Sequence, residues 1–155
     1  MSTASERLAA LDITLPPVPA PVAAYLPAVR SGLLVFTAGQ LPFVDGVLPS
    51  TGKVGKAVAP ADATQLARIA ALNAVAVVAA EAGGVDNIAR IVKVNVYVAS
   101  DPDFITLSAI ANGASDLLVE IFGDAGKHAR STLGMAVLPM DAPVEVELIA
   151  ELVAR

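Results

Sequence analysis

The feature that most constrains the fold is the segment IVKVNVYVAS at residues 91–100, because apolar and polar side chains alternate along it. Successive side chains of a strand point to opposite faces of a sheet, so this period of two predicts a strand with one buried face. The face expected to be buried carries Val92, Val94, Val96 and Val98, and the other carries Lys93, Asn95 and Tyr97. A chain built around such a strand needs a sheet.

Two helices are expected to accompany that strand. Over residues 60–82 the composition changes to Ala, Leu, Ile and Val, with Pro60 at the entry and Gly83-Gly84 at the exit, which is typical of helix ends. This helix is apolar almost all round, so we expect the sheet and another subunit to cover more than one of its faces. A second helix is predicted over residues 103–122, ended by Gly123.

Further strands are predicted before and after the helices. The run LLVFTAGQLP at residues 33–42 is almost continuously apolar, which predicts a strand buried on both faces. Residues 128–152 are interpreted as two strands joined by the turn LPMDAP, which makes a hairpin. Five of the eleven prolines lie within residues 1–30, so we expect residues 1–17 to be extended or irregular.

This order of elements indicates an α+β fold with two helices on one face of a mixed sheet. The length of 155 residues fits a single domain over residues 1–155. Arg68 and Glu81 bracket the longest apolar run, which leaves it shorter than the roughly 18 residues needed to span a membrane. The N-terminus shows no secretory signal, so we expect a soluble cytoplasmic protein with no membrane partner.

Charge and composition argue against several classes of function. The formal net charge is −5 and the ten Lys and Arg residues are scattered, so we expect no nucleic-acid partner. The absence of cysteine excludes disulfides and thiol catalysis. A single histidine is a poor basis for a metal site, so we expect no bound metal.

Several polar residues near the C-terminus are candidates for function. Arg130 lies at the start of an otherwise apolar strand, where a guanidinium is costly to bury unless it holds an anion or carboxylate. Glu145 and Glu147 share one face of the last strand, and a solvated face, an ion pair or a functional role would each fit that spacing. His128 and Ser131 are three residues apart, which on a strand turns them to opposite faces, so His128 is expected to be a lone surface histidine.

The predicted hairpin also sets a distance between two of these candidates. If its turn centres near Asp141, Arg130 and Glu145 lie roughly 23 Å apart along the strands of one chain. The two side chains could then share a pocket only across an interface. We therefore expect each site to combine Arg130 of one subunit with Glu145 of another.

Several longer blocks occur in a fixed order along the chain. They are AAYLPAVRSGLLVFTAGQLP from residue 23, Gln65 and Asn73 in the first predicted helix, IVKVNVYVASDPDF from residue 91, ARS at 129–131, and VLPMDAPVEVELIA from residue 137. Through these blocks, over roughly residues 18–152, the chain resembles the reactive intermediate deaminase family, RidA/YjgF, which is also named for an L-PSP endoribonuclease. The segment NGASDLLVEIFGDAGKHARS resembles a less-studied branch of that family.

The resemblance implies a chorismate-mutase-like fold that assembles as a homotrimer with ligand clefts between subunits. It implies that Arg130 grips a substrate carboxylate through two parallel hydrogen bonds and that Glu145 orients the attacking water. The further pocket residues that it implies are Tyr25, Ala38, Gly39, Thr132 in place of a family cysteine, His128 at the pocket edge, and a residue that is either Asn112 or Ser108. Counting back from Arg130 favours Asn112.

The implied activity is hydrolysis of short-lived enamines and imines, such as 2-aminoacrylate, to 2-keto acids and ammonia. The substrate would be a small carboxylate-bearing metabolite, and no cofactor would be needed. An alternative is a non-catalytic protein that binds keto acids in the same cleft. A third is the endoribonuclease or translation-inhibitor activity of the older family name, against which the acidic charge and sparse aromatic residues argue.

Overall fold

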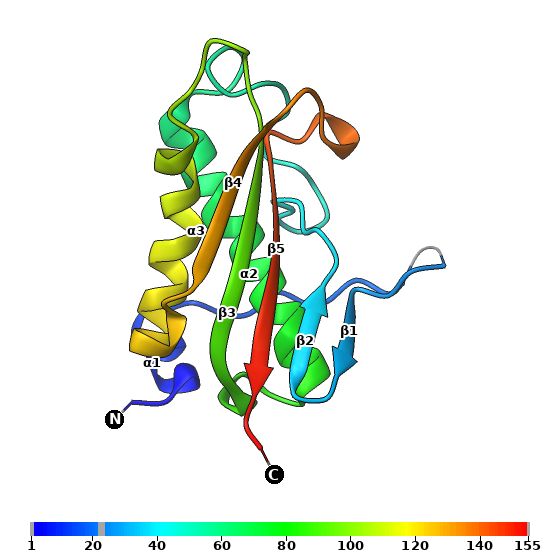
Figure 1. Cartoon of the computed structure of the whole chain (residues 1–155), viewed down its shortest axis with the longest axis vertical. Helices are drawn as coiled ribbons and strands as arrows, with labels where there is room; N and C mark the ends of the chain where they lie inside the picture. Colours follow the sequence, from blue (N-terminus) through cyan, green and yellow to red (C-terminus); the bar gives the residue numbers. More distant parts are fainter. Residues whose placement is uncertain (1, 22–23, 155) are drawn as a thin grey trace.

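A single mixed sheet of five strands organises the chain (Figure 1). The computed structural model describes residues 2–21 and 24–154; Met1, Val22, Ala23 and Arg155, which belong to the predicted domain, lie outside them. The strands are β1 (Ala28–Ser31), β2 (Leu34–Thr37), β3 (Ile88–Ala99), β4 (Ala129–Met135) and β5 (Val144–Leu152). Their order across the sheet is β1-β2-β5-β3-β4, and only β3 and β4 pair in parallel.

Two long helices, α2 (Pro60–Ala82) and α3 (Leu107–Phe122), cover one face of this sheet (Figure 1). The predicted α+β architecture is therefore confirmed. The ends of α2 also agree with prediction, because a proline opens the helix and Gly83 closes it in the left-handed conformation at φ 74°. By contrast, α3 starts later than expected, since Asp101 accepts hydrogen bonds from the backbone of Asp103 and Phe104 and holds a turn before the helix.

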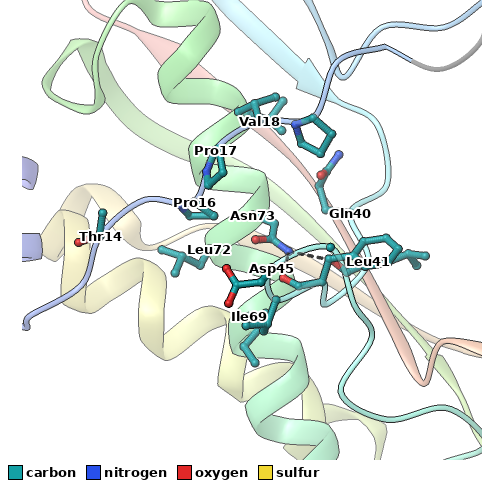
Figure 2. A pocket seen from close by; sticks show the side chains of 15 residues that line it. Thr14, Pro16, Pro17, Val18, Gln40, Leu41, Asp45, Ile69, Leu72 and Asn73 are labelled. Carbon is teal, nitrogen blue, oxygen red and sulfur yellow. Dashed lines mark hydrogen bonds between the residues drawn. The ribbon is translucent and has the colours of Figure 1, made fainter.

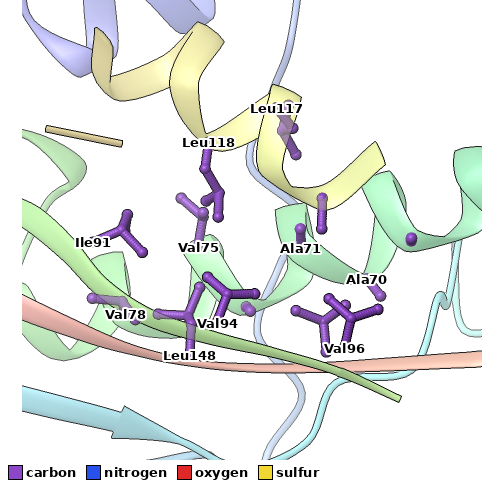
Figure 3. Close-up of a cluster of buried hydrophobic side chains, with 14 of the residues drawn as sticks. Ala70, Ala71, Val75, Val78, Ile91, Val94, Val96, Leu117, Leu118 and Leu148 are labelled. Carbon is purple, nitrogen blue, oxygen red and sulfur yellow. The ribbon is translucent and has the colours of Figure 1, made fainter. Parts of the chain in front are cut away.

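The hydrophobic core lies between the helices and the sheet, and Figure 3 shows part of it. Val94 and Val96 of β3 are fully buried there, as their alternation predicts. Val92 departs from the pattern, because it is only half-buried while its neighbour Ile91 is fully buried. The register with β5 shifts between Ile91 and Lys93, and this bulge reverses the alternation upstream of it.

The predicted hairpin over residues 128–152 is wrong. Strand β4 pairs in parallel with β3, with Arg130 beside Val94, and β5 pairs with β3 from the opposite side. Because α3 runs from the end of β3 back to the start of β4, the chain can place β4 beside β3 in the same direction. The connection after β4 then carries the chain across the end of β3 to its other edge.

Two expectations for the first forty residues also need correction. Residues 4–10 are not irregular, because they form helix α1 (Ala4–Ala10), which begins with a reciprocal capping box between Thr3 and Glu6. The proline-bearing residues 13–21 do lack regular structure. Strand β2 is not buried on both faces, since Val35 is fully buried while Phe36 is 40% exposed. The reason is that helices of the described residues cover one face of the sheet and leave Phe36 on the other.

Helix α2 is long and apolar enough to cross a membrane by length and composition alone, which differs from the sequence-based expectation. However, 61% of its most apolar stretch is buried inside the protein, against the sheet and α3. Burial of this kind is what a core helix requires. The apolar composition of α2 is therefore explained by its burial in the core of the fold.

The second face of the sheet carries no helix from the described residues (Figure 1). We call it the open face. Its apolar side chains include Phe36, Leu133 and Ile149, and its polar side chains include Lys93, Asn95, Tyr97, Glu145 and Glu147. Most of these side chains are only half-buried.

Candidate functional site

Arg130 lies on the edge strand β4, and its side chain turns toward α3. The residue is paired with Val94, whose side chain faces the helices, so Arg130 points to the same side of the sheet. Its Nη1 donates to Asn112 Oδ1 at 2.9 Å and to Ser115 Oγ at 3.0 Å. Its Nη2 lies 3.4 Å from the Ser108 carbonyl oxygen. We call these residues, with His128, the arginine cluster.

The helical partners of Arg130 follow from their spacing. Positions 108, 112 and 115 are separated by four and then three residues, which brings them onto one side of a helix. Of the two alternatives for the pocket residue, Asn112 contacts Arg130 through its side chain and Ser108 through its backbone carbonyl. Ser115 was not among the sequence-predicted site residues, although the same spacing points to it.

His128 is not the lone surface histidine expected from the sequence. It is half-buried, its Nε2 lies 3.0 Å from Ser115 Oγ, and its Nδ1 lies 2.7 Å from the Gly126 carbonyl oxygen. A carbonyl only accepts hydrogen bonds, so we assign the proton of the neutral ring to Nδ1, which leaves Nε2 to accept from the Ser115 hydroxyl. A continuous chain of hydrogen bonds thus runs from Arg130 through Ser115 to His128.

Among the described residues, the guanidinium of Arg130 has no acidic partner. The ion pairs among the described residues join Arg68 to Glu120 and Lys127 to Asp124, and neither involves Arg130. All of its protein contacts are to neutral oxygens, and Nη2 holds only the long contact to Ser108. The planar guanidinium of Arg130 is therefore positioned by the protein, and its charge remains available to an anion.

Glu145 lies on β5, on the other side of β3 from β4, where it pairs with Tyr97 on the open face. Gly39 lies directly against it, because a Cβ at position 39 would overlap Glu145 Oε1 and approach Glu145 Cδ to 2.7 Å. Two backbone hydrogen bonds of 2.8 and 2.9 Å between Gln40 and Val146 hold this loop against β5. A Cβ at position 39 would therefore push the Glu145 carboxylate out of its present place.

The neighbouring carboxylate, Glu147, differs from Glu145 because two side chains donate hydrogen bonds to it. Its Oε1 accepts from the Tyr97 hydroxyl at 2.6 Å and from Asn95 Nδ2 at 2.9 Å. The hydrogen bond to Glu147 raises the pKa of Tyr97 to about 12, with burial adding to the shift, so the phenol stays a donor. Sequence reasoning identified the shared face but not these bonds.

Burial raises the pKa of the Glu145 carboxyl above its ordinary value, and the negative charge of Glu147 adds to the shift. No side chain among the described residues donates a hydrogen bond to Glu145. A half-buried carboxylate without donors is a better proton acceptor than one that is already hydrogen-bonded. We call Glu145, Glu147, Gly39, Asn95 and Tyr97 the glutamate cluster.

The two clusters lie on opposite faces of the sheet. Arg130 pairs with Val94 and Glu145 with Tyr97, so they are three residues apart along β3, about 10 Å, rather than roughly 23 Å. The larger predicted distance was wrong because it assumed that β4 and β5 form a hairpin. The two side chains nevertheless point away from each other, one toward α3 and one into the open face. A site combining them from two subunits therefore stays a prediction.

The remaining predicted residues are distributed as follows. Thr132 pairs with Val96 and so lies on the same side of β4 as Arg130. Ala38 precedes Gly39 and donates its backbone N–H to Pro27 at 2.8 Å. Tyr25 is 62% exposed, and no hydrogen bond joins it to either cluster among the described residues. The structure thus brings most of the predicted residues into the two clusters, places Thr132 and Ala38 next to cluster members, and leaves Tyr25 apart from both.

Comparisons with known proteins find relatives along nearly the whole chain. The family model described as "YjgF/chorismate mutase-like, putative endoribonuclease" matches residues 5–152. Protein TCP17 of Trypanosoma cruzi is 42% identical over 96% of each chain. The 2-iminobutanoate/2-iminopropanoate deaminase of Escherichia coli is 36% identical over 85% of this chain and 90% of its own. The crystal structure of Atu1372 from Agrobacterium tumefaciens, of unknown function, is 40% identical with a TM-score of 0.89, covering 97% of this chain and 94% of that one.

Proposed function

The chain belongs to the YjgF/chorismate mutase-like family, and on this premise we propose that it hydrolyses reactive imines and enamines of the 2-aminoacrylate type to 2-keto acids and ammonia. The name of the Escherichia coli relative, an iminobutanoate and iminopropanoate deaminase, supports this class of substrate. The observation that carries the proposal is the guanidinium of Arg130, which is fixed by three neutral oxygens and has no acidic partner.

Arg130 would hold the carboxylate of the substrate. A planar guanidinium forms two parallel hydrogen bonds with a carboxylate, which fixes orientation as well as position. Asn112 and Ser115 already direct Nη1, so little side-chain entropy would be lost when the substrate binds. The imine carbon, one bond from that carboxylate, would then have a defined place in the cleft.

Glu145 would activate the water. It would take a proton from water as the oxygen attacks the imine carbon, the C=N bond electrons would pass to nitrogen, and Glu145 would give that proton to the nitrogen. Collapse of the resulting carbinolamine expels ammonia and leaves the keto group. The raised pKa of Glu145 makes its carboxylate a stronger proton acceptor than an ordinary glutamate, which supports this role.

We further propose that the working form is a homotrimer in which Arg130 of one subunit meets Glu145 of the next. Within one chain the two side chains point to opposite faces of the sheet. Each face of a single subunit therefore carries only one of the two residues that the proposed reaction needs. The partly exposed apolar side chains of the open face, Phe36 and Leu133 among them, support contact with another subunit.

The test is pyruvate release from 2-aminoacrylate generated in the assay by a pyridoxal-phosphate dehydratase. We expect wild type to accelerate it and Arg130→Ala to lower kcat/KM by about ten- to a hundredfold, as loss of a charge-assisted pair predicts. Arg68→Ala removes an arginine that pairs with Glu120 between α2 and α3, and serves as the matched control. Equal rates for wild type and Arg130→Ala would rule out the proposal, and binding of pyruvate without turnover would favour a metabolite-binding protein.

A further inference from the structure

A cavity of about 640 Å³ lies away from both clusters, between the N-terminal segment and α2 (Figure 2). Its floor is formed by apolar side chains of α2, and its walls by the proline-rich residues 14–19 and the loop of residues 40–46. This volume falls within the range of small-molecule sites. None of the residues assigned above to the two clusters lines it.

The walls of the cavity are held in place. Asn73 projects from α2 toward the loop, and its Nδ2 donates to the Leu41 carbonyl at 2.9 Å and to the Phe43 carbonyl at 3.1 Å (Figure 2). The tip of the loop is a tight turn at Asp45-Gly46, with φ of 50° and 79°, closed by reciprocal bonds between Val44 and Val47. On the opposite wall, prolines restrict the backbone.

The polar side chains that line this cavity are Thr14, Gln40, Asp45 and Asn73, and hydrogen-bond acceptors prevail among their free groups. Both protons of Asn73 Nδ2 are used by the loop, which leaves its Oδ1 as an acceptor. Gln40 Nε2 uses one of its two protons for the Ala38 carbonyl at 3.3 Å, which leaves its other proton and the acceptor Oε1. The Asp45 carboxylate faces α2 in Figure 2, and it forms no ion pair with a described residue. The lining includes no Lys, Arg or His.

From this lining we infer a second binding site, which takes a small ligand with an apolar body and a positively charged amine. The apolar walls would bury the body, and Asp45 with the two amide oxygens would receive the ammonium protons. The same acceptors repel carboxylates, so the cavity would reject the anionic substrate that Arg130 is proposed to hold. The inference therefore stands on this cavity alone and does not depend on deaminase activity.

The experiment compares two ligands of nearly equal size and opposite charge, 2-phenylethylammonium and 3-phenylpropionate, by titration of the full chain followed through backbone amide NMR shifts. We expect the ammonium to bind with shifts at Leu41, Gly46 and Asn73, and the carboxylate to leave these amides unmoved. Asp45→Asn should weaken ammonium binding about three- to tenfold, as for a partly exposed ion pair. Glu81→Gln, an equal change of charge at an exposed residue of α2 outside the lining, should not weaken it.

Four results would overturn the inference. They are no ammonium binding at millimolar concentration, equal binding of the carboxylate, equal loss in Asp45→Asn and Glu81→Gln, and shifts confined to other parts of the chain. A concentration-dependent change at these amides without ligand would also overturn it, because the cavity would then receive a second copy of the chain. Well-dispersed amide spectra of each variant establish that the fold is intact.

Discussion

The arginine cluster and the glutamate cluster are built in opposite ways. Arg130 is held by neutral oxygens from one helix, so its geometry is set within a single chain. Glu145 has no side-chain donor among the described residues, and it is positioned by the space that Gly39 leaves. One cluster is therefore ordered for binding before any ligand arrives, while the other holds a carboxylate whose proton affinity is raised by burial. This difference suits one cluster to binding and the other to proton transfer.

The largest effect should come from Glu145→Gln, which keeps the shape of the side chain but cannot accept a proton. We expect kcat for imine hydrolysis to fall by about a hundredfold or more, with KM little changed. Glu151→Gln, at the far end of the same face of β5, is the control. Steady-state kinetics with the in situ assay measures both variants. A change in KM alone would mean that Glu145 contributes to substrate binding and not to proton transfer. The two clusters would then not differ in role.

A smaller effect is expected from Arg130→Lys, because lysine retains the charge and loses the planar fork. KM should rise roughly tenfold while kcat changes less, since a lysine can attract the carboxylate but cannot orient it with two parallel bonds. Calorimetric binding of pyruvate should weaken by a similar factor. An unchanged KM in this variant would show that a positive charge alone is sufficient to bind the substrate carboxylate.

Ser115→Ala should raise KM a fewfold, because one hydrogen bond that directs Nη1 is lost while the Asn112 bond remains. Ser115→Thr keeps the hydroxyl and should restore much of the affinity. A purely structural role of Ser115 predicts instead that thermal stability falls and KM does not move. Kinetics and thermal melts on the same preparations distinguish the two outcomes.

The smallest expected effect concerns stability against pH. The folded pKa of Glu145 is raised, so the folded chain binds this proton more tightly than the unfolded chain does. This contribution is fully present below the unfolded pKa and is lost as pH rises through the folded pKa. The Tm of Glu145→Gln relative to wild type should therefore increase as pH rises above the ordinary glutamate pKa of about 4.3. A pH-independent difference would mean that burial does not perturb this carboxyl.

Local features were predictable from the sequence, and pairings set by distant contacts were not. The ends of α2 and the buried faces of Val94 and Val96 depend on neighbouring residues, so pattern and capping chemistry were sufficient. The hairpin was wrong because residues 128–152 alone cannot reveal that β3 would lie between β4 and β5.

The candidate site was only partly predictable for the same reason, because it depends on contacts between residues far apart in the sequence. Arg130 was identifiable as a costly charge at the start of a strand, whereas its link to Ser115 and His128 appears only after α3 is placed against β4. The bulge near Ile91 also has no local signal, since Val92 continues the alternation in the sequence. Resemblance to a family selected Glu145, but its contact with Gly39 is separated by more than a hundred residues and required the fold.

The contact between Gly39 and Glu145 has a consequence for how this protein can change over generations. A larger residue at position 39 would displace the Glu145 carboxylate from its present place, whereas it would meet no such carboxylate if position 145 were shortened. In a pairwise mutational library, Gly39→Ala should be harmful with glutamate at 145 and nearly neutral with alanine there. Descendants that abandon proton transfer would be free to fill position 39, and a side chain there would mark a lineage that has lost the activity.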